Sequence, residues 1–130
     1  MKINVLLVDD SAAIRKILLR TLVQADLSIA EVHEANDGLE ALKILNTTDI
    51  NLVLSDVNMP NLDGLELLNK IKAQARWKDL PVILITTEGS HAKVLEAVRL
   101  GAKGYVRKPF TSEQIREKVL SCMAEVAASD

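Results

Sequence analysis

The chain has 130 residues, a net charge of −2 and an aromatic content of 2%. This charge argues against a general nucleic-acid binder, and the scarcity of aromatic residues removes the stacking platforms that single-strand binders use. The one cysteine, Cys122, excludes an intramolecular disulfide framework, and no apolar run resembles a signal peptide or approaches the ~20 residues of a membrane span. We therefore expect a soluble cytoplasmic protein with one domain over residues 1–130, because no linker or repeat divides it.

Five strand-like segments alternate with five helix-like segments. Short apolar runs predict strands over residues 3–8, 29–35, 52–55, 82–87 and 102–107. Apolar residues three and four apart predict amphipathic helices. Their expected core faces are Ile14, Ile17, Leu18 and Leu22; Leu39, Leu42 and Leu45; Leu65, Leu67, Leu68 and Ile71; Val94, Leu95 and Val98; and Ile115, Val119, Cys122, Met123 and Val126. Gly101 is expected to end the fourth helix, and Thr111 with Gln114 predicts a capping box at the start of the last.

This alternation predicts an α/β fold, in which a parallel sheet is covered on both faces because right-handed crossovers pack their helices back onto it. The carboxyl ends of such strands leave a crevice where successive helices switch faces. The polar residues at these strand ends are Asp9 and Asp10, Asp56, Thr86 with Thr87, and Lys108. We expect their side chains to meet at one edge of the sheet.

Three carboxylates in one crevice repel each other by about 4 kcal/mol per close pair at an effective dielectric constant of 20. A cation must offset this repulsion, and a ligand set of carboxylates without His or Cys favours Mg²⁺ or Mn²⁺ over zinc. Magnesium held by few carboxylates accepts phosphate oxygens, and Lys108 adds a positive charge suited to the same group. Asp56 is then the natural nucleophile, which forms an acyl phosphate.

Each of these residues has an ordinary structural explanation when taken alone. Asp9 and Asp10 are typical of a helix cap or a solvated turn, Thr86 of a pleated strand, and Lys108 of a solvated surface. Their occurrence in this order, at four strand ends of one α/β chain, favours the functional explanation.

Four stretches of the chain resemble the receiver domain of two-component response regulators. They are VDDS at 8–11, LSDVNMPNLDGLELL at 54–68, PVILIT at 81–86 and GYVRKPF at 104–110. The resemblance covers essentially the whole chain and is strongest to the single-domain chemotaxis regulators of the CheY type. It implies a doubly wound, flavodoxin-like (βα)5 domain with the strand order 2-1-3-4-5, which the periodicity of the sequence does not determine.

The resemblance implies roles for individual residues at the strand ends. Asp56 would be the phosphoacceptor. The side chains of Asp10 and Asp56 and the backbone carbonyl of Asn58 would bind Mg²⁺, with Asp9 acting through a water molecule. Lys108 would pair with the phosphoryl group.

The same resemblance implies a switch that responds to phosphorylation. Thr86 would supply the switch hydroxyl, and Tyr105 would turn inward as Thr86 moves toward the phosphoryl group. The Lys108–Pro109 bond would be a cis peptide. Asn58 and Glu88 match positions that tune how water reaches the acyl phosphate and so its lifetime.

Further implications concern partners and activity. The phosphoryl donor would be a sensor histidine kinase of the CheA type, and the output surface would be formed by the fourth helix, fifth strand and fifth helix. The target would be a protein such as the flagellar motor switch, and a phosphatase is a further candidate partner. We expect a monomer that contacts neither nucleic acid nor membrane and is not a turnover enzyme.

Several other functions are compatible with parts of the pattern. One is a relay intermediate that passes phosphate onward to a histidine phosphotransfer protein, and another is the isolated receiver of a transcription regulator, although the chain ends at Asp130 without a basic recognition helix. An aspartyl phosphatase of the haloacid dehalogenase type needs a second acid two residues after its nucleophile, where this chain has Asn58. A dinucleotide-binding role lacks a Gly-x-Gly-x-x-Gly motif after the first strand.

A few residues are expected to stand apart from this chemistry or to depart from the family pattern. Trp77 is expected to pack in a loop near Asp56, and His33 and His91 to lie on the surface. Arg107 places a charge on the proposed output face, which points to an altered choice of partner. The small residues at 11–13 differ from the chemotaxis pattern and point to altered docking of the kinase or the phosphatase.

Overall fold

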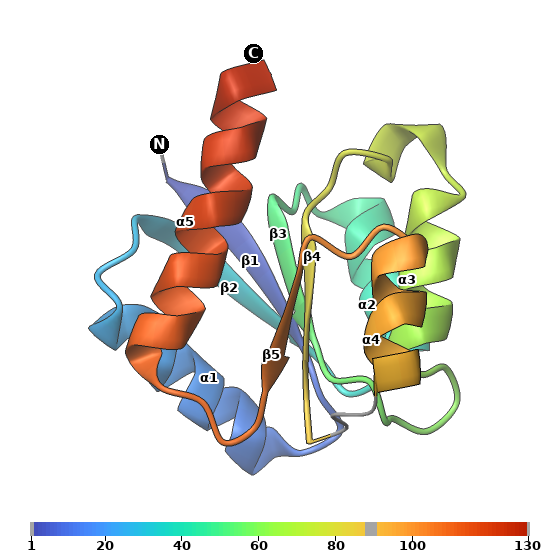
Figure 1. The fold of residues 1–130 in the computed structure, drawn as a ribbon, viewed down its shortest axis with the longest axis horizontal. Helices are drawn as coiled ribbons and strands as arrows, with labels where there is room; N and C mark the ends of the chain where they lie inside the picture. Colours follow the sequence, from blue (N-terminus) through green and yellow to red (C-terminus); the bar gives the residue numbers. More distant parts are fainter. Residues whose placement is uncertain (1, 88–90, 130) are drawn as a thin grey trace.

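Five parallel strands form one sheet in the order β2-β1-β3-β4-β5 in the computed structural model (Figure 1). The strands are β1 (Ile3–Val8), β2 (Ile29–Ala35), β3 (Leu52–Ser55), β4 (Val82–Thr86) and β5 (Gly104–Arg107). The helices are α1 (Ala12–Gln24), α2 (Gly38–Thr47), α3 (Gly64–Lys72), α4 (His91–Arg99) and α5 (Ser112–Ser129), with a 3₁₀ turn, η1 (Ala75–Trp77), before β4. The structure describes residues 2–87 and 91–129, with side chains as far as residue 123. The predicted α/β class and strand order are confirmed.

The helices divide into two layers around the sheet. Figure 1 shows α1 and α5 on one face and α2, α3 and α4 on the other. Each layer closes its own apolar core: Leu18, Leu22 and Ile115 belong to the first, and Leu67 and Leu68 to the second. Because both faces are covered, the central strands read as continuous apolar runs rather than as alternating ones.

The strand register places the predicted site residues next to one another. Val8, the last residue of β1, pairs with Ser55, the last residue of β3. The amide of Asp56 donates to the carbonyl of Val8 at 2.9 Å. The residues that follow β1 and β3 therefore start from the same edge of the sheet, at the lower end of the strands in Figure 1.

Side-chain caps fix where the helices begin. Ser11 caps α1, and Asp63 forms a capping box with Glu66 at the start of α3. The capping box predicted before α5 is also present, since Thr111 N donates to Gln114 Oε1 at 2.9 Å and Gln114 N donates to Thr111 Oγ1 at 3.1 Å. Gly101 follows α4 with a φ of 101°, a conformation that favours glycine at a helix end.

The helix faces differ from prediction where small residues face the core. Ile17, Leu39, Leu95 and Val98 were expected in the core but are 47%, 49%, 56% and 62% exposed. Fully buried Ala41 and Ala97 contact the core in α2 and α4 instead, which leaves their larger neighbours outside.

The two later strands are also shorter than predicted, because Thr87 follows β4 and β5 begins only at Gly104. No helix among the described residues has both the length and the apolar character to cross a bilayer.

Gly64 brings the start of α3 against the backbone of the strand-end loop. A Cβ atom at this position would lie 2.2 Å from the carbonyl oxygen of Asp56 and 2.9 Å from the Cα of Val57. The amide of Gly64 also donates to the carbonyl of Val57 at 2.8 Å. The backbone that carries Asp56 is thus packed directly against the first turn of a helix.

Replacing Gly64 with Ala is expected to destabilise the protein by about 2 kcal/mol, because the new Cβ overlaps main-chain atoms that cannot rotate away. Urea unfolding measures the change. Gly104→Ala is the matched control, since its Cβ would first meet the side chain of Ile83 at 3.4 Å, an ordinary contact. Equal stability changes in the two variants would contradict the close approach at Gly64.

Candidate functional site

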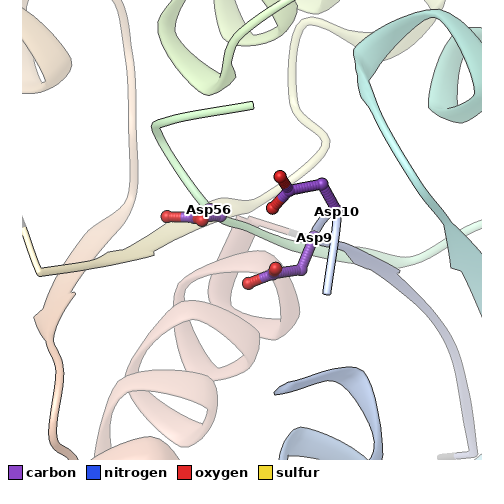
Figure 2. Close-up of side chains that lie close together, drawn as sticks. All are labelled: Asp9, Asp10 and Asp56. Carbon is purple, nitrogen blue, oxygen red and sulfur yellow. The ribbon is translucent and has the colours of Figure 1, made fainter. Parts of the chain in front are cut away.

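Three carboxylates from two strand ends lie together at the carboxyl edge of the sheet. Asp9 and Asp10 follow β1, Asp56 follows β3, and one oxygen from each lies within 4.8 Å of the others. Figure 2 shows the three groups pointing in the same general direction. Asp9 is buried and Asp10 is exposed, so the cluster runs from the protein interior to the surface.

Asp9 is held by hydrogen bonds to both carboxylate oxygens. Oδ1 accepts from the amide of Ser11 at 2.9 Å, and Oδ2 accepts from Lys108 Nζ at 3.1 Å. The amide of Asp9 donates to the carbonyl of Ala35 at 3.1 Å, which continues the pairing of β1 with β2. A carboxylate that is only 2% exposed is therefore compensated by a cation and a backbone dipole.

Asp56 is less well compensated than Asp9. Its Oδ1 accepts from the amide of Val57 at 2.8 Å, and its Oδ2 lies 3.6 Å from Lys108 Nζ. Burial raises the pKa of Asp56 above its ordinary value, and the nearby charge of Asp9 raises the pKa further. Lys108 and the amides of Val57 and Asn58 oppose this rise in the pKa without cancelling it. The central carboxylate therefore carries an unfavourable charge, which a cation would relieve.

Lys108 reaches the cluster from the opposite side, at the end of β5. Its amide donates to the carbonyl of Thr86 at 2.8 Å, which ties the end of β5 to the end of β4. The Lys108–Pro109 peptide bond is cis, as the resemblance implied. Thr86 ends β4 and is fully buried, whereas Thr87 is exposed.

The other predicted site residues lie at different distances from the cluster. Asn58 is exposed in the loop after β3, where its backbone amide contacts the Asp56 carboxylate. Tyr105 is half-buried on β5 and packs against the core on the α2, α3 and α4 side. Glu88 lies outside the described residues.

Trp77 was expected near Asp56, and this is wrong. Trp77 lines a pocket with Ile50, Asn51 and Pro81, residues that precede β3 and β4, so it lies at the amino end of the sheet. Arg76 stacks over its ring at 4.1 Å from the centroid. The chain segment 75–77 comes before β4, and in a parallel sheet such a segment is at the edge opposite to the site.

Arg15 contacts the site and was not considered in the sequence analysis. From the second turn of α1 its Nη1 donates to the backbone carbonyl of Asp9, and its Nε donates to Glu34 Oε1 on β2 at 2.9 Å. The available signal was a basic residue one turn after the capping Ser11. The many surface cations of similar helices make that signal weak.

The donor set of the cluster fits a hard divalent cation. Asp9, Asp10 and Asp56 offer carboxylate oxygens, and no His or Cys belongs to the group they form among the described residues. Carboxylate oxygens are the ligands that Mg²⁺ and Mn²⁺ prefer, while soft or borderline metals select nitrogen and sulfur.

Comparison with known proteins agrees with this geometry. The model of the response regulator receiver domain matches residues 5–120. A chemotaxis protein CheY homolog from Campylobacter jejuni is 39% identical over 117 residues, covering 89% of this chain and 88% of that protein. The chemotaxis protein CheY1 of Helicobacter pylori is also 39% identical, covering 89% of this chain and 93% of that protein.

Solved structures show the same relationship in three dimensions. The chemotaxis response regulator CheY4 of Vibrio cholerae superimposes with a TM-score of 0.83 at 35% identity, covering 94% of this chain and 99% of that one. A CheY-like receiver domain protein from Methanospirillum hungatei superimposes with a TM-score of 0.88 at 25% identity, and each chain is covered completely. The acidic cluster thus lies in a known kind of signalling module rather than in a turnover enzyme, and the chain belongs to the response regulator receiver domain family.

Proposed function

We propose that this protein is a chemotaxis-type response regulator, which accepts a phosphoryl group from a histidine kinase on Asp56 and then binds a target through α4, β5 and α5. The observation that carries the proposal is the position of Lys108 Nζ, 3.1 Å from Asp9 Oδ2 and 3.6 Å from Asp56 Oδ2. A phosphoryl group on Asp56 would bring its oxygens beside this ammonium group. That pairing is the electrostatic stabilisation on which phosphoryl transfer depends.

The acidic cluster would hold Mg²⁺ through the side chains of Asp10 and Asp56 and the backbone carbonyl of Asn58, with Asp9 acting through water. Mg²⁺ supplies positive charge that offsets the carboxylates and attracts phosphoryl oxygens. Asp9 is already engaged by Ser11 and Lys108, which supports an indirect role for it. Asp10, at the exposed side of the cluster, is open to a ligand from solvent.

The transfer reaction would use Asp56 as the nucleophile. One carboxylate oxygen of Asp56 attacks the phosphorus of the donor phosphohistidine, a P–O bond forms, and the P–N bond breaks as the electron pair leaves with the imidazole. The ammonium group of Lys108 would form an ion pair with the phosphoryl oxygens during the transfer. The amide of Val57, which donates to Asp56 Oδ1 at 2.8 Å, keeps that oxygen turned toward the backbone and leaves Oδ2 for attack.

The output would follow from the added charge at the edge of the sheet. A phosphoryl group brings about −1.5 to −2 charges and three acceptor oxygens. Thr86 and Lys108 are joined by a backbone hydrogen bond of 2.8 Å, and Tyr105 is paired in register with Leu84 on β4. A movement of Thr86 toward the phosphoryl group would therefore shift β5 as well, and Tyr105 would turn inward to fill the space that Thr86 leaves.

The exposed face of α4 supports this choice of output surface. Leu95 and Val98 are 56% and 62% exposed, which leaves two large apolar side chains in solvent next to β5. The relatives from Campylobacter jejuni and Helicobacter pylori are chemotaxis proteins. A CheA-like kinase as donor and a flagellar motor switch as target are the partners that we propose on this basis.

Replacing Asp56 with Asn is expected to reduce labelling by radioactive acetyl phosphate in Mg²⁺ to background, because an amide oxygen cannot form the acyl phosphate. Labelling of the wild-type protein should also be lost in EDTA. Asp26→Asn is the control, since Asp26 is exposed and has a φ of 55°, which Asn tolerates. Stoichiometric labelling of the Asp56 variant would refute the assignment of the site.

The same substitution is expected to raise the free energy of unfolding by about 1 to 2 kcal/mol at pH 7 without divalent cations. The variant removes an incompletely compensated charge, while Lys108 keeps its partner Asp9 at 3.1 Å. Saturating Mg²⁺ should reduce the difference because it would stabilise the wild-type protein more. Chemical unfolding at pH 7 with and without Mg²⁺ measures both effects.

The sign of the pH dependence follows from the raised pKa of Asp56. Folded protein holds the Asp56 proton to higher pH than unfolded protein does, so the wild type loses stability as pH rises from the ordinary pKa of 3.8 through the raised one. The advantage of the Asn variant is thus complete above that window and shrinks as pH falls through it. An advantage that does not change between pH 7 and pH 4 would contradict this electrostatic explanation.

A further inference from the structure

We propose that Arg15 is a positioning residue for the cation site: it fixes the peptide group between Asp9 and Asp10 and thereby sets where the Asp10 carboxylate lies. The inference rests on the proposed function, because it gives Asp10 a cation to bind. Arg15 bonds to the backbone carbonyl of Asp9 and to Glu34 rather than to a carboxylate of the acidic cluster, so its effect on that cluster is exerted through the backbone.

The guanidinium group of Arg15 joins two strands and a helix. Nη1 donates to the backbone carbonyl of Asp9, and Nε donates to Glu34 Oε1 at 2.9 Å. The Arg15 side chain is only 12% exposed, whereas Glu34 is 45% exposed. An arginine that is mostly buried and holds two acceptors through separate nitrogens is a rigid brace, because the planar guanidinium fixes both directions at once.

The bond to the Asp9 carbonyl matters because of peptide planarity. The carbonyl of Asp9, the amide of Asp10 and the Cα atoms of both residues lie in one plane. A carbonyl oxygen that is held in place therefore fixes the direction in which the chain reaches Asp10. The strand pairing of Asp9, whose amide donates to Ala35 at 3.1 Å, holds the same segment from the other side.

Asp10 depends on this backbone control more than its neighbours do. Asp9 accepts two hydrogen bonds, and Asp56 accepts one from Val57. Among the side chains described, which are those of residues 2–87 and 91–123, no hydrogen bond or ion pair is found for the exposed Asp10 carboxylate, although one of its oxygens lies within 4.8 Å of the other two acids. Its place in the cluster is consequently set by its backbone.

Charge and positioning predict opposite results when Arg15 is replaced. Arg15 is a cation close to a site for a cation, so the loss of its charge alone would strengthen cation binding by reducing repulsion. The loss of a positioning contact would weaken binding, because ligands that are no longer oriented bind metals less tightly. The direction of the change therefore separates the two effects.

Binding of Mn²⁺, measured from the electron paramagnetic resonance signal of the free ion, is the test. Arg15→Gln is expected to raise the Mn²⁺ dissociation constant about tenfold, the lower end of the range seen for residues that orient metal ligands. Arg15→Lys, which can still donate one hydrogen bond to the Asp9 carbonyl, should recover part of this loss. The Asp10 amide resonance of the cation-free protein should shift in Arg15→Gln and return toward its original position in Arg15→Lys.

Lys16→Gln is the matched control, because Lys16 is the exposed next residue of α1 and carries the same charge. It should leave Mn²⁺ binding unchanged or slightly tighter. Equal or tighter binding by Arg15→Gln, in a protein whose circular dichroism shows that it is folded, would overturn the inference alone. If Arg15→Gln does not fold, the Mn²⁺ affinity of Arg15→Lys decides the question. Weaker binding than in the wild-type protein would support the inference, and unchanged binding would overturn it. Failure of the wild-type protein to bind Mn²⁺ would instead overturn the proposed function on which the inference rests.

Discussion

The contact of Lys108 with two carboxylates is the interaction on which the rest of the site depends. Its Nζ lies 3.1 Å from Asp9 Oδ2 and 3.6 Å from Asp56 Oδ2, so one cation links the ends of β1, β3 and β5. Without it, the buried Asp9 and the largely buried Asp56 would face each other with only backbone amides as compensation. Lys108 is itself placed by the backbone, since its amide donates to Thr86 on β4. The parallel sheet thus supplies both the acids and the charge that stabilises them.

The positive charge at the site only partly compensates the negative charge of the carboxylates. One lysine opposes three carboxylates, and burial together with Asp9 keeps the pKa of Asp56 raised. A site with surplus negative charge attracts a divalent cation, and under the proposed function that cation would attract the phosphoryl group that Asp56 would receive. Residues around the acids hold the backbone that carries them. Gly64 fixes the backbone of Asp56 from α3, and Arg15 braces the backbone of Asp9 from α1.

The architecture and the convergence of three acids and Lys108 at one edge of the sheet were predictable from sequence, because both depend on strong local signals. Apolar runs ended by Asp9 and Asp56 fix where strands stop, and alternation with helices then brings those ends to one edge. Helix orientation was less predictable, because apolar spacing does not tell a buried Ala97 from an exposed Leu95. The brace formed by Arg15 depends on contacts between distant segments, which single-sequence patterns do not encode. The location of Trp77, in contrast, follows from its place before β4 in a parallel sheet and was predictable.

The central claim is that Asp56 receives the phosphoryl group beside Lys108. The most direct measurement is reduction of the phosphorylated protein with borohydride, which converts an aspartyl phosphate to homoserine, followed by tandem mass spectrometry of the peptides. The account predicts homoserine at position 56 and unmodified aspartate at positions 9 and 10. Homoserine at position 9 or 10, or phosphate retained on a different residue while Asp56 stays unmodified, would contradict it.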